Sequence, residues 1–212
     1  MRELKSDLFG TVWRDEARGS DCVLRDTATA RWWIGWLARS LCRREARALA
    51  HLDGLAGTPR LLSADSRSLR REWIEGRPMQ LAGPRDPQYF RAARALLVRL
   101  HRCGIAHNDL AKEPNWLVTP AGAPAVVDFQ LALVARRRGR LFRALAREDV
   151  RHLLKHKRRY CPERLTSRER DILARPAAIS RLWSATGKRA YTFLTRRIFG
   201  WADREGASER RF

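Results

Sequence analysis

Short apolar runs separated by turn residues occupy the first part of the chain. The run LFGTVWR, a turn over 15–20 that contains Gly19, and the run DCVLRDT predict a hairpin and a further strand. Between positions 57 and 81, the apolar runs are again short and end at Gly76 and Pro78, which is typical of two more strands. This part of the chain is therefore predicted to be rich in β-strands.

Apolar residues spaced by three and four predict helices elsewhere. One helix is expected over about 30–52, with an apolar stripe formed by Ile34, Leu37, Leu41, Ala48 and Leu52. A second is expected over about 87–104, and the chain from Arg136 onward has a mainly helical pattern. Between them, WLV and AVV predict two short strands around a turn at 119–124.

The order of these elements predicts the fold class. Strands, one long helix and more strands are followed by a hinge-like Gly-Arg-Pro and then mostly helix, which is an α+β layout in two lobes. We expect a single domain over 1–212, with a small β-rich N-lobe over 1–76 and a mostly helical C-lobe over 77–212.

Composition excludes several classes of protein. Apolar residues make up 44% of the 212 residues, enough for a packed core although 32% are charged, so a disordered charged tail is excluded. No apolar run is long enough to span a bilayer, and the start MRELKSDLFG is unlike a secretory signal. Because the four cysteines are far apart, we expect reduced thiols packed in the core: Cys22, Cys42, Cys103 and Cys161.

The formal net charge of +21 is unevenly distributed. Residues 1–135 hold 21 basic and 15 acidic side chains, whereas residues 136–212 hold 23 basic and only 8 acidic ones. The last third could therefore meet phosphate groups, nucleic acid or an anionic membrane surface, and charge alone does not choose among them.

Two segments carry the candidate chemistry. HNDLAKEPN places Asp109 two residues after His107 and six before Asn115, and VVDFQ places Asp128 at the end of a predicted strand. In phosphoryl transfer, one carboxylate orients the attacking hydroxyl, while a second carboxylate and an amide oxygen hold Mg²⁺ on the nucleotide phosphates. This set of side chains therefore points to phosphoryl transfer.

At these residues the sequence resembles the protein-kinase-like superfamily. LHRCGIAHNDLAKEPNWLV is similar to its catalytic loop, and VVDFQLA is similar to its D-F-G segment, with Gln130 in place of glycine. The resemblance implies ATP and Mg²⁺ as cofactors, Asp109 as the catalytic aspartate, and Asn115 and Asp128 as metal ligands. It covers residues 5–160 and is strongest toward RIO-type atypical kinases and bacterial lipopolysaccharide core-sugar kinases.

The N-terminal part extends the resemblance. CVLR puts Arg25 where the family has its phosphate-binding lysine, and REARAL puts Glu45 at the helix glutamate that pairs with it. LFGTVWR retains only Gly10 of a glycine-rich loop, for which a purely structural role is the alternative. SLRREWIEGRP is similar to the hinge that receives adenine, which implies nucleotide contacts at Glu72 and Ile74.

Three residues have two interpretations each. Glu45 lies on an apolar stripe, so it either meets a buried cation or reaches the edge of the stripe. Asp149 either anchors the catalytic loop or is an exposed helix charge. His107 is expected to brace the loop rather than to act as a base.

The basic end of the chain bears on the partner. RRRGR and KHKRR are followed by SRLWSATGKRAYTFLTRRIFGW, which predicts an amphipathic helix that either packs on its own domain or lies on an anionic membrane or RNA. We expect a cytoplasmic Ser/Thr protein kinase of RIO-like type. A glycolipid acceptor, as in a Kdo or heptose kinase at the inner membrane, is the alternative. Because arginine is not equivalent to lysine at position 25, a pseudokinase or basic RNA-binding module is a further alternative.

Overall fold

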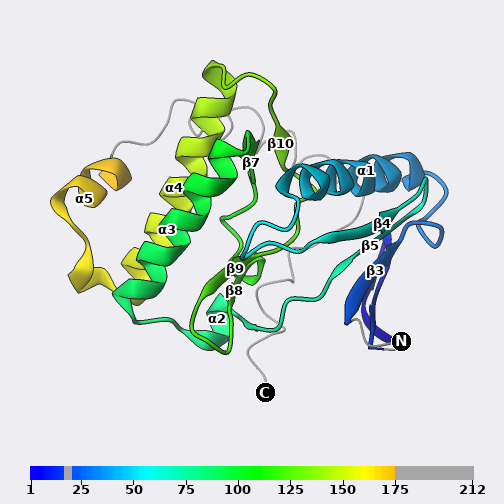
Figure 1. The fold of residues 1–212 in the computed structure, drawn as a ribbon, viewed down its shortest axis with the longest axis horizontal. Helices are drawn as coiled ribbons and strands as arrows, with labels where there is room; N and C mark the ends of the chain where they lie inside the picture. Colours follow the sequence, from blue (N-terminus) through cyan, green and yellow to red (C-terminus); the bar gives the residue numbers. More distant parts are fainter. Residues whose placement is uncertain (17–20, 175–212) are drawn as a thin grey trace. The chain divides into compact units, whose positions relative to one another are not determined.

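The computed structural model describes residues 1–16 and 21–174. Its N-lobe contains a five-stranded antiparallel sheet with the strand order β1-β2-β3-β5-β4 (Figure 1). The strands are β1 (Arg2–Asp7), β2 (Gly10–Asp15), β3 (Cys22–Asp26), β4 (Leu61–Ala64) and β5 (Ser68–Glu72). The predicted strands are thus present, and LFGTVWR contains the turn between β1 and β2 as well as most of β2.

Gly10 begins β2 for a conformational reason. Its φ is +122°, which is left-handed backbone, and a Cβ at this position would lie 2.1 Å from the carbonyl oxygen of Asp26. Only glycine fits this close approach of two chain segments. The turn geometry therefore accounts for the residue without any ligand.

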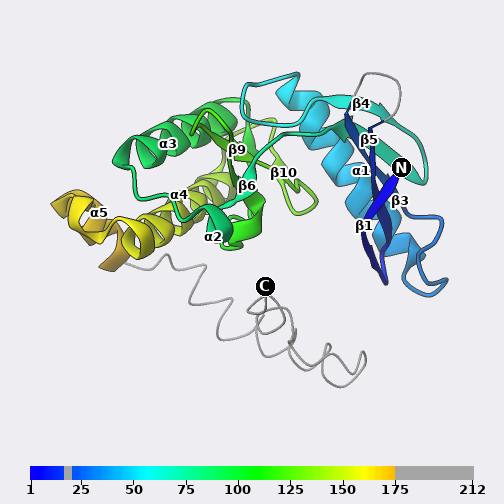
Figure 2. The same cartoon turned by 90° about the horizontal axis from the view of Figure 1, so that it is seen from below.

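Helix α1 (Gly35–Leu52) packs alongside the sheet and contacts β4 and β5 (Figure 2). The expected start near residue 30 was wrong, because the chain before Gly35 forms tight turns. The amide of Ala30 donates to the carbonyl of Thr27, and the amide of Ile34 donates to the carbonyl of Arg31. These bonds span three residues, so α-helical bonding starts only afterwards.

The C-lobe is built on two long helices, α3 (Pro87–Arg102) and α4 (Arg140–Tyr160), which contact each other. The N-terminus of α3 is capped by Asp86, whose side chain accepts a hydrogen bond from the Gln88 amide at 2.8 Å. The remaining elements are α2 (Met79–Ala82), α5 (Ser167–Ala174), the 3₁₀ turns η2 (Glu113–Asn115) and η3 (Pro162–Arg164), and the short strands β6 (Arg77–Pro78), β7 (Ile105–Ala106), β8 (Trp116–Val118), β9 (Pro124–Val126) and β10 (Leu133–Val134).

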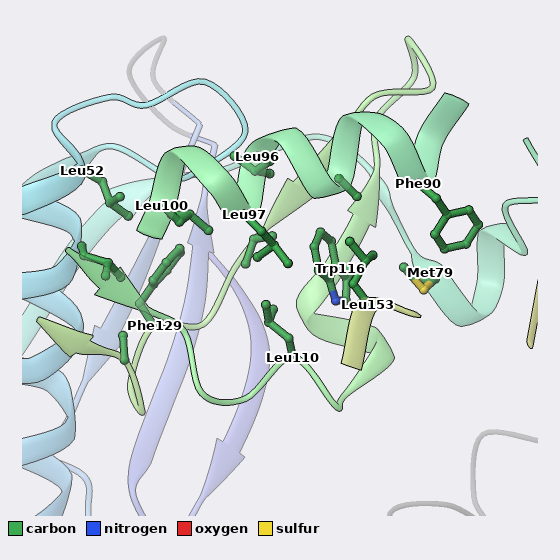
Figure 3. Close-up of a cluster of buried hydrophobic side chains, with 14 of the residues drawn as sticks. Leu52, Met79, Phe90, Leu96, Leu97, Leu100, Leu110, Trp116, Phe129 and Leu153 are labelled. Carbon is green, nitrogen blue, oxygen red and sulfur yellow. The ribbon is translucent and has the colours of Figure 1, made fainter. Parts of the chain in front are cut away.

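A cluster of buried apolar side chains lies between α1, α3, α4 and the short strands (Figure 3). Trp116 of β8 and Phe129 are both fully buried in it, and Leu97 and Leu100 contribute the inward face of α3. Burial of each such side chain contributes about 1.5–3 kcal/mol to folding. Because Trp116 and Phe129 directly follow Asn115 and Asp128, this core fixes the backbone on which the candidate site stands.

Three further expectations can be compared with the structure. Cys22, Cys42 and Cys161 are buried thiols as expected, but Cys103 is exposed because it caps α3 at its solvent end. None of the helices in the described ranges is long and apolar enough to cross a bilayer. The amphipathic helix expected around residues 180–201 lies outside the described residues.

Candidate active site

Asp109 lies in the loop between β7 and η2, with its side chain 15% exposed. Asn115 donates from Nδ2 to both the backbone oxygen and Oδ2 of Asp109, at 2.9 and 3.1 Å. The Nζ of Lys112 lies 3.1 Å from the same Oδ2 atom. The loop thus presents one carboxylate oriented by an amide and a cation, and Lys112 is a member of the site that sequence reasoning missed.

Asp149 of α4 anchors this loop from below. Its carboxylate is 1% exposed and accepts hydrogen bonds from the backbone amides of His107 and Asn108, at 2.8 and 2.9 Å. His101 approaches the same carboxylate through Nε2 at 3.1 Å. Asn108 has a left-handed φ of 64°, and these bonds hold it there. Of the two interpretations for Asp149, the anchor is confirmed.

His107 braces the loop, as predicted. The ring is fully buried, its Nε2 lies 3.0 Å from the carbonyl oxygen of Val127, and it packs against Phe129 with 4.6 Å between ring centroids. A base must reach the proton that it removes. A side chain enclosed in this way instead joins the Asp109 loop to the segment that carries Asp128.

The β8–β9 hairpin brings Asp128 next to Asn115. Trp116 pairs with Val126, and the amide of Val127 donates to the carbonyl of Asn115 at 3.0 Å. Asp128 follows immediately, with a left-handed φ of 67°. Such strain in a residue other than glycine is retained where surrounding contacts fix it, which is common at functional sites.

The charge on Asp128 is fixed by its neighbours. Burial by itself would raise the pKa of this carboxyl group, but attraction to Arg25, a hydrogen bond from Gln130 Nε2 at 2.7 Å, and the charges of His107 and Arg71 outweigh it. The net effect is a lowered pKa. Asp128 is therefore a carboxylate at neutral pH, and its attraction to Arg25 couples the two lobes electrostatically.

Glu45 lies fully buried between two arginines. Its carboxylate oxygens are 3.3 Å from Nε of Arg25 on β3 and 3.2 Å from Nε of Arg71 on β5. The two arginine side chains are 17% and 13% exposed. Neither contact has hydrogen-bond geometry, so the group is held by charge. The apolar stripe of α1 therefore carries Glu45 toward a cation, and the alternative of a side chain at the stripe's edge was wrong.

Sequence reasoning missed Arg71. Burial lowers the pKa of its guanidinium group, while attraction to Glu45 and to Asp128 opposes that shift. The available signal was strand alternation: Leu69, two residues earlier, is 1% exposed, so Arg71 points to the same side of the sheet. A charged residue at such a position predicts a buried partner.

Three other residues were predicted to contact the nucleotide: Gly10, Glu72 and Ile74. Residues 73–76 join β5 to β6 as the expected hinge would, and Ile74 is half-buried within them. The Glu72 side chain turns back and accepts from the Arg60 amide at 3.3 Å. Gly10 lies at the start of β2. Adenine contacts at Glu72 and Ile74, and a phosphate contact at Gly10, stay predictions.

Asn115 and Asp128 have the donor atoms that Mg²⁺ requires. Because Nδ2 of Asn115 and Oδ1 of Asp128 are used in hydrogen bonds, Oδ1 of Asn115 and Oδ2 of Asp128 remain to coordinate. Within the described residues, no group of three His, Cys, Asp or Glu side chains converges on one point. A nucleotide-type Mg²⁺ site needs only one or two protein oxygens, because phosphates and water complete it.

No protein-family model and no curated protein matches the chain. Two solved structures of Rio2 kinase from Chaetomium thermophilum are similar to it. The first has a TM-score of 0.58 and 17% identity over 74% of this chain and 55% of that one. The chain has a protein-kinase-like fold.

The second neighbour is the Rio2 kinase-ADP/Mg²⁺-phosphoaspartate complex, with a TM-score of 0.55 and 16% identity. It aligns over 76% of this chain and 56% of that one, so the kinase-like chain spans little more than half the length of either structure. The expected α+β fold, with a β-rich N-lobe and a mostly helical C-lobe, is confirmed.

Proposed function

We propose that the protein is a MgATP-dependent phosphotransferase that acts on a hydroxyl group. The observation that supports this most directly is the junction of three side chains at one end of the β8–β9 hairpin. Asn115 binds Asp109 through two hydrogen bonds, and the strand pairing sets Asp128 beside Asn115. Phosphoryl transfer depends on positioning and on charge stabilisation, which this arrangement provides.

Asp109 orients the acceptor. Its carboxylate is partly exposed, and it is held from one side by Asn115 and Lys112. It therefore accepts a hydrogen bond from an incoming hydroxyl and directs the oxygen toward the phosphorus. The Asp149 anchor keeps the loop from relaxing when the acceptor arrives.

Asn115 and Asp128 would hold Mg²⁺, which neutralises phosphate charge when bound. Asp128 contributes a full negative charge because Arg25 and Gln130 keep its pKa low. Arg25 would hold the nucleotide phosphates, and its planar fork suits phosphate oxygens. Glu45 keeps Arg25 on the inner side of the sheet.

Two kinds of acceptor are compatible with this proposal: a protein side chain and a core sugar of lipopolysaccharide. The resemblance of HNDLAKEPN and VVDFQ to RIO-type kinases favours a serine or threonine hydroxyl of a protein. The lipopolysaccharide core sugar predicted as the alternative presents the same hydroxyl chemistry to Asp109. We propose that the acceptor is a protein and that the enzyme is cytoplasmic.

Transfer of labelled γ-phosphate from ATP to a cell lysate tests this directly. The lysate is separated into protein and glycolipid fractions after reaction with the wild type and with Asp109→Asn. We expect Mg²⁺-dependent label in the protein fraction with the wild type only. Label in glycolipid would reassign the acceptor, and label in neither fraction would count against a phosphotransferase.

Asp128→Asn is expected to remove the Mg²⁺-dependent part of ATP binding. At ATP near 100 times its dissociation constant, the wild type should gain about 2.7 kcal/mol, or roughly 5–10 °C in melting temperature, when Mg²⁺ is present. The variant has lost the carboxylate charge and should show the same small shift with Mg²⁺ and with EDTA. Differential scanning fluorimetry measures the melting temperature of the wild type and the variant with ATP, in the presence of Mg²⁺ and of EDTA.

The matched control is Asp53→Asn, at the exposed C-terminal end of α1. It should retain the full Mg²⁺-dependent shift. Because the native pKa of Asp128 is lowered, the wild-type shift should persist as the pH falls below the ordinary carboxyl range and disappear only when Asp128 protonates. An undiminished Mg²⁺ effect in Asp128→Asn would remove this residue from the metal site.

A further inference from the structure

Two tryptophans at the start of α1 are unusually exposed. Trp32 is 91% exposed and Trp36 is 65% exposed, while Trp33 between them is 36% exposed. An indole usually buries most of its surface in a core or an interface. Exposed apolar surface of this size marks interaction sites in proteins that are otherwise well packed. We call Trp32 and Trp36 the tryptophan surface.

The segment that carries the tryptophan surface is held in place. Ile34, in its middle, is 6% exposed, and the amide of Arg31 donates to the carbonyl of Leu8 at 3.2 Å. The fold therefore presents these indoles outward rather than leaving them on a loose loop. These tryptophans do not contribute to the core, because α1 buries a different set of side chains that includes Glu45 and Leu49.

The same side of α1 continues as a row of arginines. Positions 43 and 47 follow position 36 by 7 and 11 residues. At 100° per residue, this spacing places Arg43 and Arg47 each within about 20° of a line drawn along the helix through Trp36. This line is opposite the buried face, and both arginines are exposed. It is about 16 Å long at 1.5 Å per residue.

The charge on this side has one sign. Throughout the described segment 28–51, the basic side chains outside the core are Arg31, Arg39, Arg43, Arg44 and Arg47, of which Arg44 donates to the carbonyl oxygens of Leu131 and Ala132. The one acidic side chain in the segment, Glu45, is fully buried and paired inside the lobe. The charge within this segment therefore favours an anionic partner that also accepts exposed indoles.

An anionic bilayer meets both requirements. Tryptophan favours the headgroup level of a bilayer, where its apolar ring and its polar N–H are both satisfied. Arginine side chains in line with it meet lipid phosphates at that depth. A straight row on the exposed side of a helix fits a flat surface, whereas single-stranded nucleic acid is bound in a groove with bases stacked on aromatic side chains.

We propose that the tryptophan surface and the Arg43–Arg47 row dock this protein on a membrane that contains anionic phospholipid. All of these residues lie within 31–47, and the proposal does not depend on the proposed phosphotransfer. Glu45 lies on the opposite side of α1 from Trp36, Arg43 and Arg47. A membrane docked on the exposed side of α1 therefore does not contact Glu45 or its partner Arg25.

Vesicle flotation of the full chain tests the proposal. Vesicles of phosphatidylcholine alone are compared with vesicles that contain about 30% of the anionic lipid phosphatidylglycerol. We expect binding to the anionic vesicles only. Trp32→Ser/Trp36→Ser should weaken it by more than about tenfold, and Arg43→Gln/Arg47→Gln by about fivefold for each arginine removed.

The matched controls lie on other exposed surfaces. Leu141→Ser on α4 removes another exposed apolar side chain, and Arg91→Gln/Arg94→Gln removes two exposed arginines from α3. Both should bind vesicles like the wild type, and all variants should keep its melting temperature. Equal flotation of the tryptophan variant and the wild type would overturn the proposal. Failure of the wild type to float with anionic vesicles would also overturn it. If the tryptophans were then found to be required for binding single-stranded RNA, the surface would be assigned to RNA instead.

Discussion

Asp109→Asn should lower the rate of phosphate transfer by about 10²–10⁴-fold while leaving ATP binding nearly unchanged. Asparagine preserves the shape of the side chain and can still contact Lys112 and Asn115. It cannot accept the hydroxyl proton or present two equivalent oxygens to the acceptor. The nucleotide contacts are assigned to other residues, so affinity for MgATP should remain. Single-turnover transfer and calorimetric ATP binding separate these quantities.

Asp171→Asn on α5 is the matched control, since Asp171 is exposed. It should transfer phosphate at the wild-type rate. If Asp109→Asn retained full activity, Asp109 would lose its proposed role, although the fold and the metal ligands would stand. If ATP binding were lost together with transfer, the variant would have disturbed the loop that Asn115 and Asp149 hold. The effect would then be structural.

The residues of the site could be predicted from sequence where side chains of the right chemical type lie close together along the chain. Asp109 and Asn115 are six residues apart in one loop, and a hydrogen bond between them requires no knowledge of the tertiary fold. Asp128 was predicted because it ends an apolar strand, and strand pairing then brings it to Asn115. These inferences rest on contacts that are close in sequence or fixed by one hairpin.

Arg71 could not be assigned so simply. Its partner, Glu45, is on α1, and the register of β3 with β5 decides that Arg25 and Arg71 approach the carboxylate from two strands. The start of α1 was also misplaced, because the helix was expected from about residue 30, whereas the chain before Gly35 forms turns. Periodicity predicts which residues share a face, but the turns at 27–34 are fixed by tertiary hydrogen bonds.

Glu45→Gln should destabilise the protein by about 3 kcal/mol, or roughly 10 °C in melting temperature. The change preserves volume but removes the negative charge between Arg25 and Arg71, which are mostly buried and would then repel each other. Glu3→Gln on the exposed strand β1 is the matched control and should melt like the wild type. Thermal melting followed by circular dichroism measures the difference.

The double variant Glu45→Gln/Arg71→Leu tests whether the loss comes from charge rather than from packing. Removing Arg71 together with Glu45 takes away the repulsion, so the double variant should recover part of the stability lost in Glu45→Gln. Arg71→Leu alone should be milder than Glu45→Gln, because Arg25 still pairs with the carboxylate. A melting temperature for Glu45→Gln within about 2 °C of the wild type would contradict a buried charge cluster. If the loss of stability in the double variant equalled the sum of the two single losses, Arg71 and Glu45 would stabilise the lobe independently. Arg25 would then be the one arginine whose charge is balanced by Glu45.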